Sequence, residues 1–203
     1  MNARRNPFET FPQYPPAVEI AQVRIRPARE ADLPAINRIY NDEILHGTAT
    51  WDTEPWSEAR RLAWWQAHGD GLQPVLAAES PDGRLLGFAY LTFVSDKPGW
   101  RFTREDTIYL DPAARGLGLG RHLLAALLDE ARRIGVRTVL ASITATNTAS
   151  IRLHERLGFE RVGVLRSAGY KFGRWLDTCY YQLDLGEPPP GAPAWDTPVG
   201  RAT

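Results

Sequence analysis

A short glycine-rich segment at residues 115–120 constrains the fold more than any other part of this 203-residue chain. Its sequence is Arg-Gly-Leu-Gly-Leu-Gly, and it lies between a strand-like run at residues 107–110 and a helix-like run at residues 119–134. Such a turn leaves backbone N–H groups free at the positive end of the helix, where phosphate groups bind. The segment therefore predicts a strand–turn–helix unit that holds a phosphate-bearing ligand.

Three patterns of phosphate-binding turn can be compared with this segment. A Walker A loop requires Lys and then Ser or Thr after its last glycine, and neither follows Gly120. A Rossmann fingerprint that starts at Gly116 requires glycine where the chain has Arg121. The third pattern, Arg-x-x-Gly-x-Gly, is matched by Arg115, Gly118 and Gly120. A glycine-rich turn without a ligand remains the alternative at this point.

Length and composition indicate one domain with an ordinary hydrophobic core. Hydrophobic residues make up 43% of the chain, and 24 basic residues balance 24 acidic ones. The sequence also shows no basic stripe, so nucleic-acid binding is not expected. The proline-rich ends at residues 1–21 and 186–203 are predicted to form an arm and a tail of extended or disordered conformation, with the domain between them at residues 22–185.

The chain shows no targeting or membrane signal. The first residues do not resemble a signal peptide, and no run is apolar enough to cross a membrane. The single cysteine, Cys179, excludes an intrachain disulfide and is compatible with a reducing compartment. The four histidines have no metal-ligand spacing, so no metal is expected. We therefore expect a cytoplasmic protein.

Hydrophobic periodicity and turn residues predict a series of strands and helices. Helices are expected at residues 30–45, from Ser57 onward, at 119–134 with Gly135 as the C-terminal cap, and at 149–157. Strands are expected at residues 23–26, 74–79, 84–93, 107–110, 139–144, 160–166 and 175–185. Early strands follow one another and later ones alternate with helices, so we expect an α/β fold with a mixed sheet and helices on both faces.

Two motifs, at residues 115–120 and 147–159, resemble the core motifs of the GNAT superfamily of N-acetyltransferases. Residues 40–43 with 48–51, and residues 171–177, resemble more narrowly the subgroup that acetylates phosphinothricin, methionine sulfone or methionine sulfoximine. The resemblance implies the GNAT acyltransferase fold, with two central parallel strands that splay apart. It also implies an enzyme that transfers an acetyl group from acetyl-CoA to an amine.

The resemblance covers about residues 23–185 and implies acetyl-CoA as co-substrate and a homodimer as the assembly. The strand that ends at Leu110 would splay from the strand at Val139, so that the pantetheine arm binds the exposed edge like an added strand. Asn147 and Ser150 are also good helix-capping residues, and both interpretations stay open. The residues that the resemblance places at the cofactor are Ile108, Tyr109, Leu110, Arg115, Gly116, Leu117, Gly118, Leu119, Gly120, Arg121, Asn147 and Ser150.

Acetyl transfer needs a neutral amine, and aliphatic amines resemble Lys, whose pKa is about 10. Glu105 is the candidate general base, with a solvated loop glutamate as the alternative. The resemblance implies that the Leu110 N–H stabilises the oxygen of the thioester carbonyl. His154 takes the position of a Tyr in many members of the superfamily, so it is the candidate acid that protonates the leaving thiolate. A histidine that only packs beside the cofactor is the alternative.

The acceptor side departs from the subgroup pattern. Ser95 stands where the subgroup carries an Arg that binds the carboxylate of the amino-acid substrate. Lys97 could replace that Arg, but as a point charge without the two-pronged geometry of a guanidinium group. We therefore expect a small-molecule amine, such as an amino-acid analogue, with altered selectivity. A protein or peptide acceptor and a non-catalytic acyl-CoA sensor stay as alternatives. The residues expected at the acceptor are Ser95, Lys97, Trp100, Glu105, Asp106 and Thr107.

Overall fold

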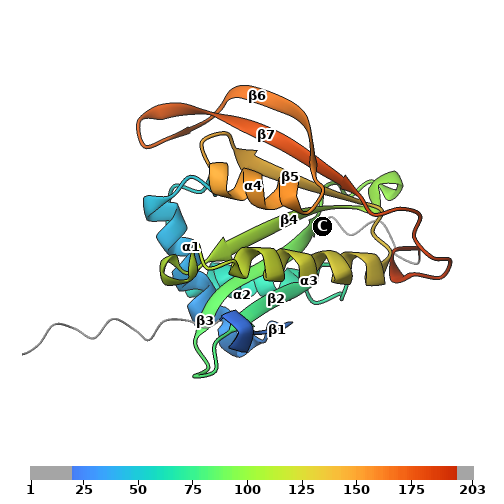
Figure 1. Cartoon of the computed structure of the whole chain (residues 1–203), viewed down its shortest axis with the longest axis horizontal. Coiled ribbons are helices and arrows are strands. Elements are labelled where there is room, and N and C mark those ends of the chain that lie inside the picture. Colours follow the sequence, from blue (N-terminus) through green and yellow to red (C-terminus); the bar gives the residue numbers. More distant parts are fainter. Residues whose placement is uncertain (1–19, 196–203) are drawn as a thin grey trace, which may run out of the picture.

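The structure, a computed structural model, describes residues 20–195, which form a seven-stranded sheet with helices packed on it (Figure 1). The strands are β1 (Arg24–Pro27), β2 (Val75–Glu79), β3 (Leu85–Phe93), β4 (Thr103–Leu110), β5 (Thr138–Thr144), β6 (Glu160–Lys171) and β7 (Arg174–Asp184). The α-helices are α1 (Leu33–His46), α2 (Glu58–Ala67), α3 (Leu119–Ile134) and α4 (Thr148–Arg156). Short 3₁₀ helices lie at Ile20–Gln22, Glu30–Asp32, Pro98–Trp100, Pro112–Ala114 and Pro193–Trp195.

The sheet has the strand order β1-β2-β3-β4-β5-β7-β6 and is mixed, as predicted. Strands β4 and β5 are parallel, whereas the other neighbouring strands are antiparallel. In this parallel pairing, residues 103–105 of β4 lie opposite residues 138–140 of β5, and the remaining described residues of the two strands are not paired with each other. The central strands therefore part toward the end of β4, which confirms the predicted splay.

Helices cover both faces of the sheet, which confirms the prediction (Figure 1). On β2, Leu76 and Ala78 belong to the cluster around α3, whereas Ala77 packs with α1. This alternation follows from the two-residue period of a strand. Helix α2 lies with α1 and begins at the predicted N-cap, where the Ser57 hydroxyl accepts the Arg60 N–H.

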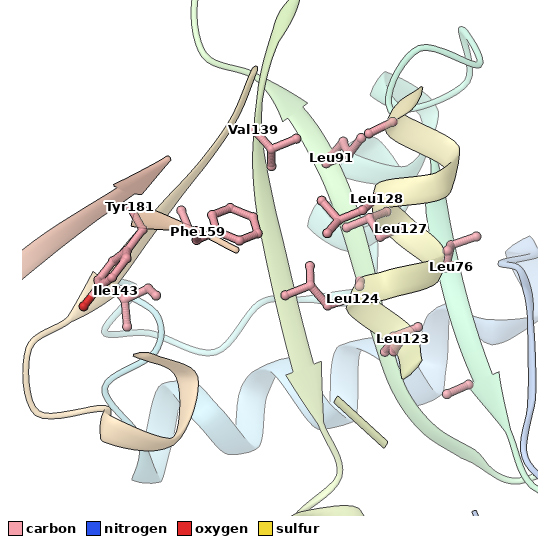
Figure 2. Packing of buried hydrophobic residues seen from close by; sticks show 14 of the residues in the cluster. Leu76, Leu91, Leu123, Leu124, Leu127, Leu128, Val139, Ile143, Phe159 and Tyr181 are labelled. Carbon is pink, nitrogen blue, oxygen red and sulfur yellow. The ribbon is translucent and has the colours of Figure 1, made fainter. Parts of the chain in front are cut away.

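Helix α3 joins its layer to the sheet through one continuous apolar face. Its predicted bounds are confirmed, and Gly135 ends it with a φ of 86°, a left-handed conformation that glycine adopts without strain. This core is built from residues of several strands, so the helix fixes how β2, β3 and β5 lie together. Figure 2 shows Leu123, Leu124, Leu127 and Leu128 of α3 near Leu76, Leu91 and Val139.

Some boundaries differ from the sequence prediction. The helix predicted at residues 30–45 opens with a 3₁₀ turn before α1, β4 already begins at Thr103, and β6 continues to Lys171. In this extension of β6 the pairing with β7 is irregular, and the Ser167 N–H donates to Asp177 Oδ1. Most of β6 is exposed, so its side chains carry no burial pattern that would reveal its length. Backbone pairing with β7 holds it in the sheet.

The start of the predicted C-terminal tail packs on the domain. Ala192 and Ala194 are buried, and a Cβ added to Gly135 would come within 2.5 Å of the Ala192 Cβ. This corrects the expectation of an extended or disordered tail for residues 190–195, which form a turn and a 3₁₀ helix whose small side chains fit against the end of α3. The N-terminal arm, apart from its last two residues, and the end of the tail lie outside the described residues.

Replacing Leu127 by Ala should lower the free energy of unfolding by about 2–5 kcal/mol, because this fully buried side chain leaves a cavity between α3 and the sheet. Urea unfolding followed by circular dichroism measures the change. The matched control is Leu62→Ala on the exposed side of α2, which should cost less than about 1 kcal/mol. Equal losses in the two variants would contradict the assigned core.

Candidate active site

A cavity of about 790 Å³ lies where β4 and β5 part. Its lining comes from the ends of β4 and β5, from α4 and the residues before it, from the segment after α1 (residues 47–51), and from the glycine turn (residues 115–120). Segments that are far apart in the sequence thus meet at one cavity. Its edges include backbone groups that a continuous sheet would have paired, so it is the candidate active site.

The backbone of β4 directs hydrogen-bonding groups toward this cavity at alternate residues. The Asp111 N–H donates to Leu86 O at 2.9 Å, so the next pair along the ladder, Gly87 with Leu110, is not hydrogen-bonded. The Leu110 N–H therefore points away from β3, toward the side from which β5 has parted. Ile108 has the same orientation because the strand repeats every two residues. This geometry suits an added strand-like ligand and an oxyanion donor at Leu110.

The glycine turn has the backbone shape of an anion site. Gly116 and Gly118 have φ angles of 78° and 88°, and a Cβ added to either would meet no atom within 4 Å. Glycine is needed for this conformation, and it lets a bulky ligand approach the backbone. Gly120 is buried instead, where an added Cβ would come within 3.3 Å of Leu153. The free N–H groups at the start of α3, with the exposed Arg121, therefore fit a pyrophosphate.

The predicted residues at the start of α4 line the cavity and also cap the helix. Asn147 Oδ1 accepts the Ser150 N–H at 3.1 Å. Ser150 Oγ in turn lies 3.3 Å from His154 Nδ1. Capping is therefore observed, and the cofactor role of Asn147 and Ser150 stays a prediction.

Glu105 lines the cavity from β4, and its side chain is partly buried. Burial raises the pKa of this carboxyl above its ordinary value, and repulsion from the Asp106 carboxylate adds to the effect. A raised pKa makes a carboxylate a better base near neutral pH. Glu105 therefore lies in a strand beside the cavity and not in a loop, and its role as the base stays a prediction.

A buried pair, Asp106 with His154, joins β4 to α4 beside the cavity. His154 Nε2 lies 3.0 Å from Asp106 Oδ2, and the two side chains are only 1% and 2% exposed. His154 Nδ1 lies 2.8 Å from Ser150 O, so both ring nitrogens face acceptors. Burial lowers the pKa of His154, but the Asp106 charge and the hydrogen bonds to Asp106 and Ser150 O outweigh it and raise the pKa overall. A protonated ring fits this geometry, because it donates from both nitrogens.

Not every predicted site residue lines the cavity. Ser95, Lys97 and Trp100 lie in the connection between β3 and β4, outside the lining, and the Lys97 N–H donates to Ser95 Oγ within that turn. Leu117 is exposed and Leu119 is buried in the core, and neither side chain lines the cavity. The other predicted residues do line it, so the structure brings together the cofactor residues and one part of the acceptor set.

Buried polar residues beside the cavity that received no role from the sequence include Glu43, Thr50 and Lys171. Lys171 Nζ donates to Thr50 O at 2.9 Å, and burial lowers the pKa of this ammonium group. The available signal was their place in residues 40–51 and 171–177, which carry the family resemblance. Their contacts were hidden because they join segments more than a hundred residues apart.

Metal-ligating side chains, thiols and apolar helices in the described part of the chain bear on other kinds of site. Residues 20–195 hold no group of three or more His, Cys, Asp or Glu placed to bind a metal ion. Cys179 is a buried free thiol in β7, away from the cavity lining. Among the described helices, none has the length and apolar character needed to span a membrane.

Comparison with known proteins agrees with this site. Residues 35–159 match the model of the acetyltransferase (GNAT) family. The chain is 44% identical to the L-methionine sulfoximine/L-methionine sulfone acetyltransferase of Salmonella typhimurium over 163 residues, which are 80% of this chain and 95% of that protein. The chain therefore belongs to the GNAT acetyltransferase family. It is an N-acyltransferase, and acetyl-CoA is its co-substrate.

Solved structures confirm the predicted GNAT fold. A phosphinothricin acetyltransferase from Sinorhizobium meliloti, in complex with acetyl-CoA, superimposes with a TM-score of 0.80 at 36% identity, covering 84% of this chain and 95% of that chain. A ribosomal-protein-alanine N-acetyltransferase from Brucella melitensis has a TM-score of 0.76 at 42% identity, covering 79% of this chain and 99% of that chain. These structures share the fold although their names refer to different acceptors.

Replacing Asp106 by Asn should lower the pKa of His154, because it removes the charge that favours the protonated ring. The folded pKa of His154 is raised, so the stability it adds is present below about pH 6.5 and is lost as the pH rises through the folded value. The variant should lack this pH-dependent loss. NMR titration of the His154 ring protons, assigned with His154→Phe, and urea unfolding at several pH values measure the two effects.

The matched control is Asp42→Asn, which removes the carboxylate beside the exposed His46. It should leave the titration of His154 unchanged. A His154 titration that is also unchanged in Asp106→Asn would contradict the role assigned to the buried pair.

Proposed function

We propose that the protein acetylates the amine of a small molecule, such as an amino-acid analogue related to methionine sulfone, methionine sulfoximine or phosphinothricin. The observation that carries the proposal is the cavity where β4 and β5 part, because it brings the glycine turn and Glu105 to one site. The relatives from Salmonella typhimurium and Sinorhizobium meliloti are named for these analogues, which supports the acceptor class.

Glu105 acts as the general base, directly or through one water molecule. The acceptor must lose a proton before it attacks, since an ammonium ion has no lone pair. The partly buried carboxylate of Glu105, with its raised pKa, accepts this proton at one side of the cavity. General-base help of this kind contributes about 10²–10⁴-fold to the rate.

Other residues hold the co-substrate and stabilise the charge that develops on it. The N–H groups of the glycine turn bind the pyrophosphate, with Arg115 and Arg121 as cations, and the free edge of β4 at Ile108 binds the pantetheine amides. The Leu110 N–H stabilises the thioester oxygen while the carbon–nitrogen bond forms, and one such donor contributes about 3 kcal/mol. The carbon–sulfur bond then breaks with its electron pair on sulfur, so that CoA leaves as a thiolate, and the nitrogen releases its remaining extra proton to solvent to give the neutral amide.

His154 supplies a proton to the departing sulfur through the Ser150 hydroxyl, which lies 3.3 Å from His154 Nδ1 and lines the cavity. The Asp106 carboxylate favours the protonated ring, so a proton is held beside the cavity before the reaction. The ring also packs edge-on against Phe159, which fixes its plane. His154 is therefore packed, as the alternative states, but its charge pair with Asp106 favours the acid role.

The test is a thiol-release assay with acetyl-CoA and a panel of acceptors: the three named analogues, simple aliphatic amines and peptides with a free N-terminus. We expect release with one or more amino-acid analogues. The exposed position of Lys97, outside the cavity lining, favours weak binding of the acceptor carboxylate. Release with peptides alone would favour a protein acceptor, as in the name of the Brucella melitensis relative. Release with none would favour an acyl-CoA sensor.

Replacing Glu105 by Gln should lower kcat/KM by about 10²–10⁴-fold, and most of all below the pKa of the acceptor amine, because an amide cannot accept the proton. Steady-state kinetics across a pH series measures the loss. The control is Glu160→Gln at the exposed start of β6, which should retain full activity. Full activity in Glu105→Gln would remove this residue from the mechanism.

We further propose a cytoplasmic homodimer that uses the exposed face of the β6–β7 hairpin, which lies at the edge of the sheet (Figure 1). Large apolar side chains gather there in contact with water, and such patches usually mark interfaces. The free thiol of Cys179 supports a reducing compartment. The exposed apolar residues of the hairpin are Val162, Val164, Leu165, Tyr170, Phe172 and Trp175.

Light scattering should give about twice the 22.7 kDa mass of one chain. Trp175→Asp should shift the protein to the monomer, because a charge would be buried in the interface. The control is Leu62→Asp, on exposed α2, which should remain dimeric. A wild-type monomer at micromolar concentration would contradict the proposed assembly.

A further inference from the structure

Glu43 is a buried carboxylate on α1 that contacts two parts of the site. Its side chain is 10% exposed. Glu43 Oε1 accepts the Ala49 N–H at 2.9 Å, and Glu43 Oε2 accepts from Arg115 Nη2 at 3.1 Å. A Cβ added to Gly47 would overlap this carboxyl group, so glycine there leaves room for it. One side chain thus joins the segment after α1 to the first residue of the glycine turn.

The segment at residues 48–51 lines the cavity and has few contacts within itself. It is held by side chains from other elements: Lys171 Nζ donates to Thr50 O at 2.9 Å, and Tyr109 Oη donates to Ala49 O at 3.4 Å. These contacts engage its carbonyl groups. Glu43 instead accepts a backbone N–H, and it is the contact that connects the segment to the glycine turn.

Arg115 is half-exposed and lies at the glycine turn. Its Nε donates to Leu110 O at 3.2 Å, and its Nη2 donates to Glu43. A guanidinium group has five N–H donors, so these two bonds leave others for an anion. The Glu43 carboxylate nevertheless shares the positive charge and repels any anion bound at the turn. Affinity for a phosphate group at this turn is therefore lower than the same arginine would give alone.

We propose that residues 48–51, which line the cavity and include none of the predicted cofactor residues, face the acceptor, and that Glu43 is a positioning residue that couples them to the glycine turn. Glu43 thereby sets the affinities for acceptor and CoA in opposite directions. The inference rests on the proposed function for the identity of the two substrates. A carboxylate at this position holds the segment at residues 48–51 through the Ala49 N–H, which favours acceptor binding. It also competes with the pyrophosphate for Arg115, which weakens CoA binding and eases release of the CoA product.

The test is Glu43→Gln, which keeps the size of the side chain and the acceptor oxygen for Ala49 N–H but removes the charge. Calorimetric titration with CoA, in the absence of an acceptor, should show a dissociation constant lower by about twofold to fivefold, the size of one partly screened charge interaction. At saturating acetyl-CoA, the KM of the acceptor should rise by a similar factor, because a neutral amide accepts the Ala49 N–H less strongly than a carboxylate.

A double-mutant cycle identifies the route of the coupling. Arg115→Gln alone should weaken CoA binding and raise the acceptor KM, because Glu43 loses the cation that holds it. In the Arg115→Gln background, Glu43→Gln should no longer tighten CoA binding, so the two changes should be non-additive. Since Arg115 is half-exposed, Arg115→Gln should fold even if Glu43→Gln does not, and it tests the same contact from the other side.

The matched control is Asp129→Asn, which breaks a similar carboxylate–arginine pair with Arg132 on α3, outside the cavity lining. It should change neither the CoA dissociation constant nor the acceptor KM. Unchanged or weaker CoA binding in Glu43→Gln would overturn the inference, as would an Arg115→Gln variant with a normal acceptor KM. Failure of the wild type to acetylate any acceptor would instead overturn the proposed function, while the CoA titration would still report on the contact.

Discussion

The site depends on one constraint: the parallel strands β4 and β5 pair over only a few residues and then part. A continuous sheet would satisfy the edges of both strands and leave no space between them. The parting places the Leu110 N–H and the Ile108 backbone at a free edge and opens the cavity beside them. Around this gap the core is conventional, with α3 packed on one face and α1 and α2 on the other. The packing of the helices on the sheet thus stabilises the fold, while the candidate active site lies where β4 and β5 part.

Charged groups beside the cavity are arranged in pairs that cross between elements. Asp106 of β4 contacts His154 of α4, and Glu43 of α1 contacts Arg115 of the glycine turn. Both carboxylates are nearly buried, and a buried charge is costly unless it is paired. Glu105 differs, because no ion pair or hydrogen bond is assigned to its carboxylate among the described residues and its pKa is raised. An unpaired carboxylate suits a base, whereas the paired ones suit residues that hold others in place.

Local patterns made much of this fold predictable from the sequence. The bounds of α3, its cap at Gly135 and the Ser57 cap of α2 depend on neighbouring residues, so the sequence reveals them. The full length of β6 did not follow, because that strand is held by β7 and not by its own burial. The packing of Ala192 against Gly135 was hidden for a similar reason: it joins the tail to a helix end about sixty residues earlier.

By itself, the sequence determined the glycine turn and the order of the motifs, since each is written in a local run of residues. It offered Glu105 and His154 as candidates through the family resemblance, and their chemistry stays a prediction. Tertiary structure alone decided that Asp106 pairs with His154 and that Glu43 joins Ala49 to Arg115. It also left Ser95, Lys97 and Trp100 outside the cavity lining. The physical reason is that a side chain's partner and exposure are set by the packing of distant segments, and no local spacing records that packing.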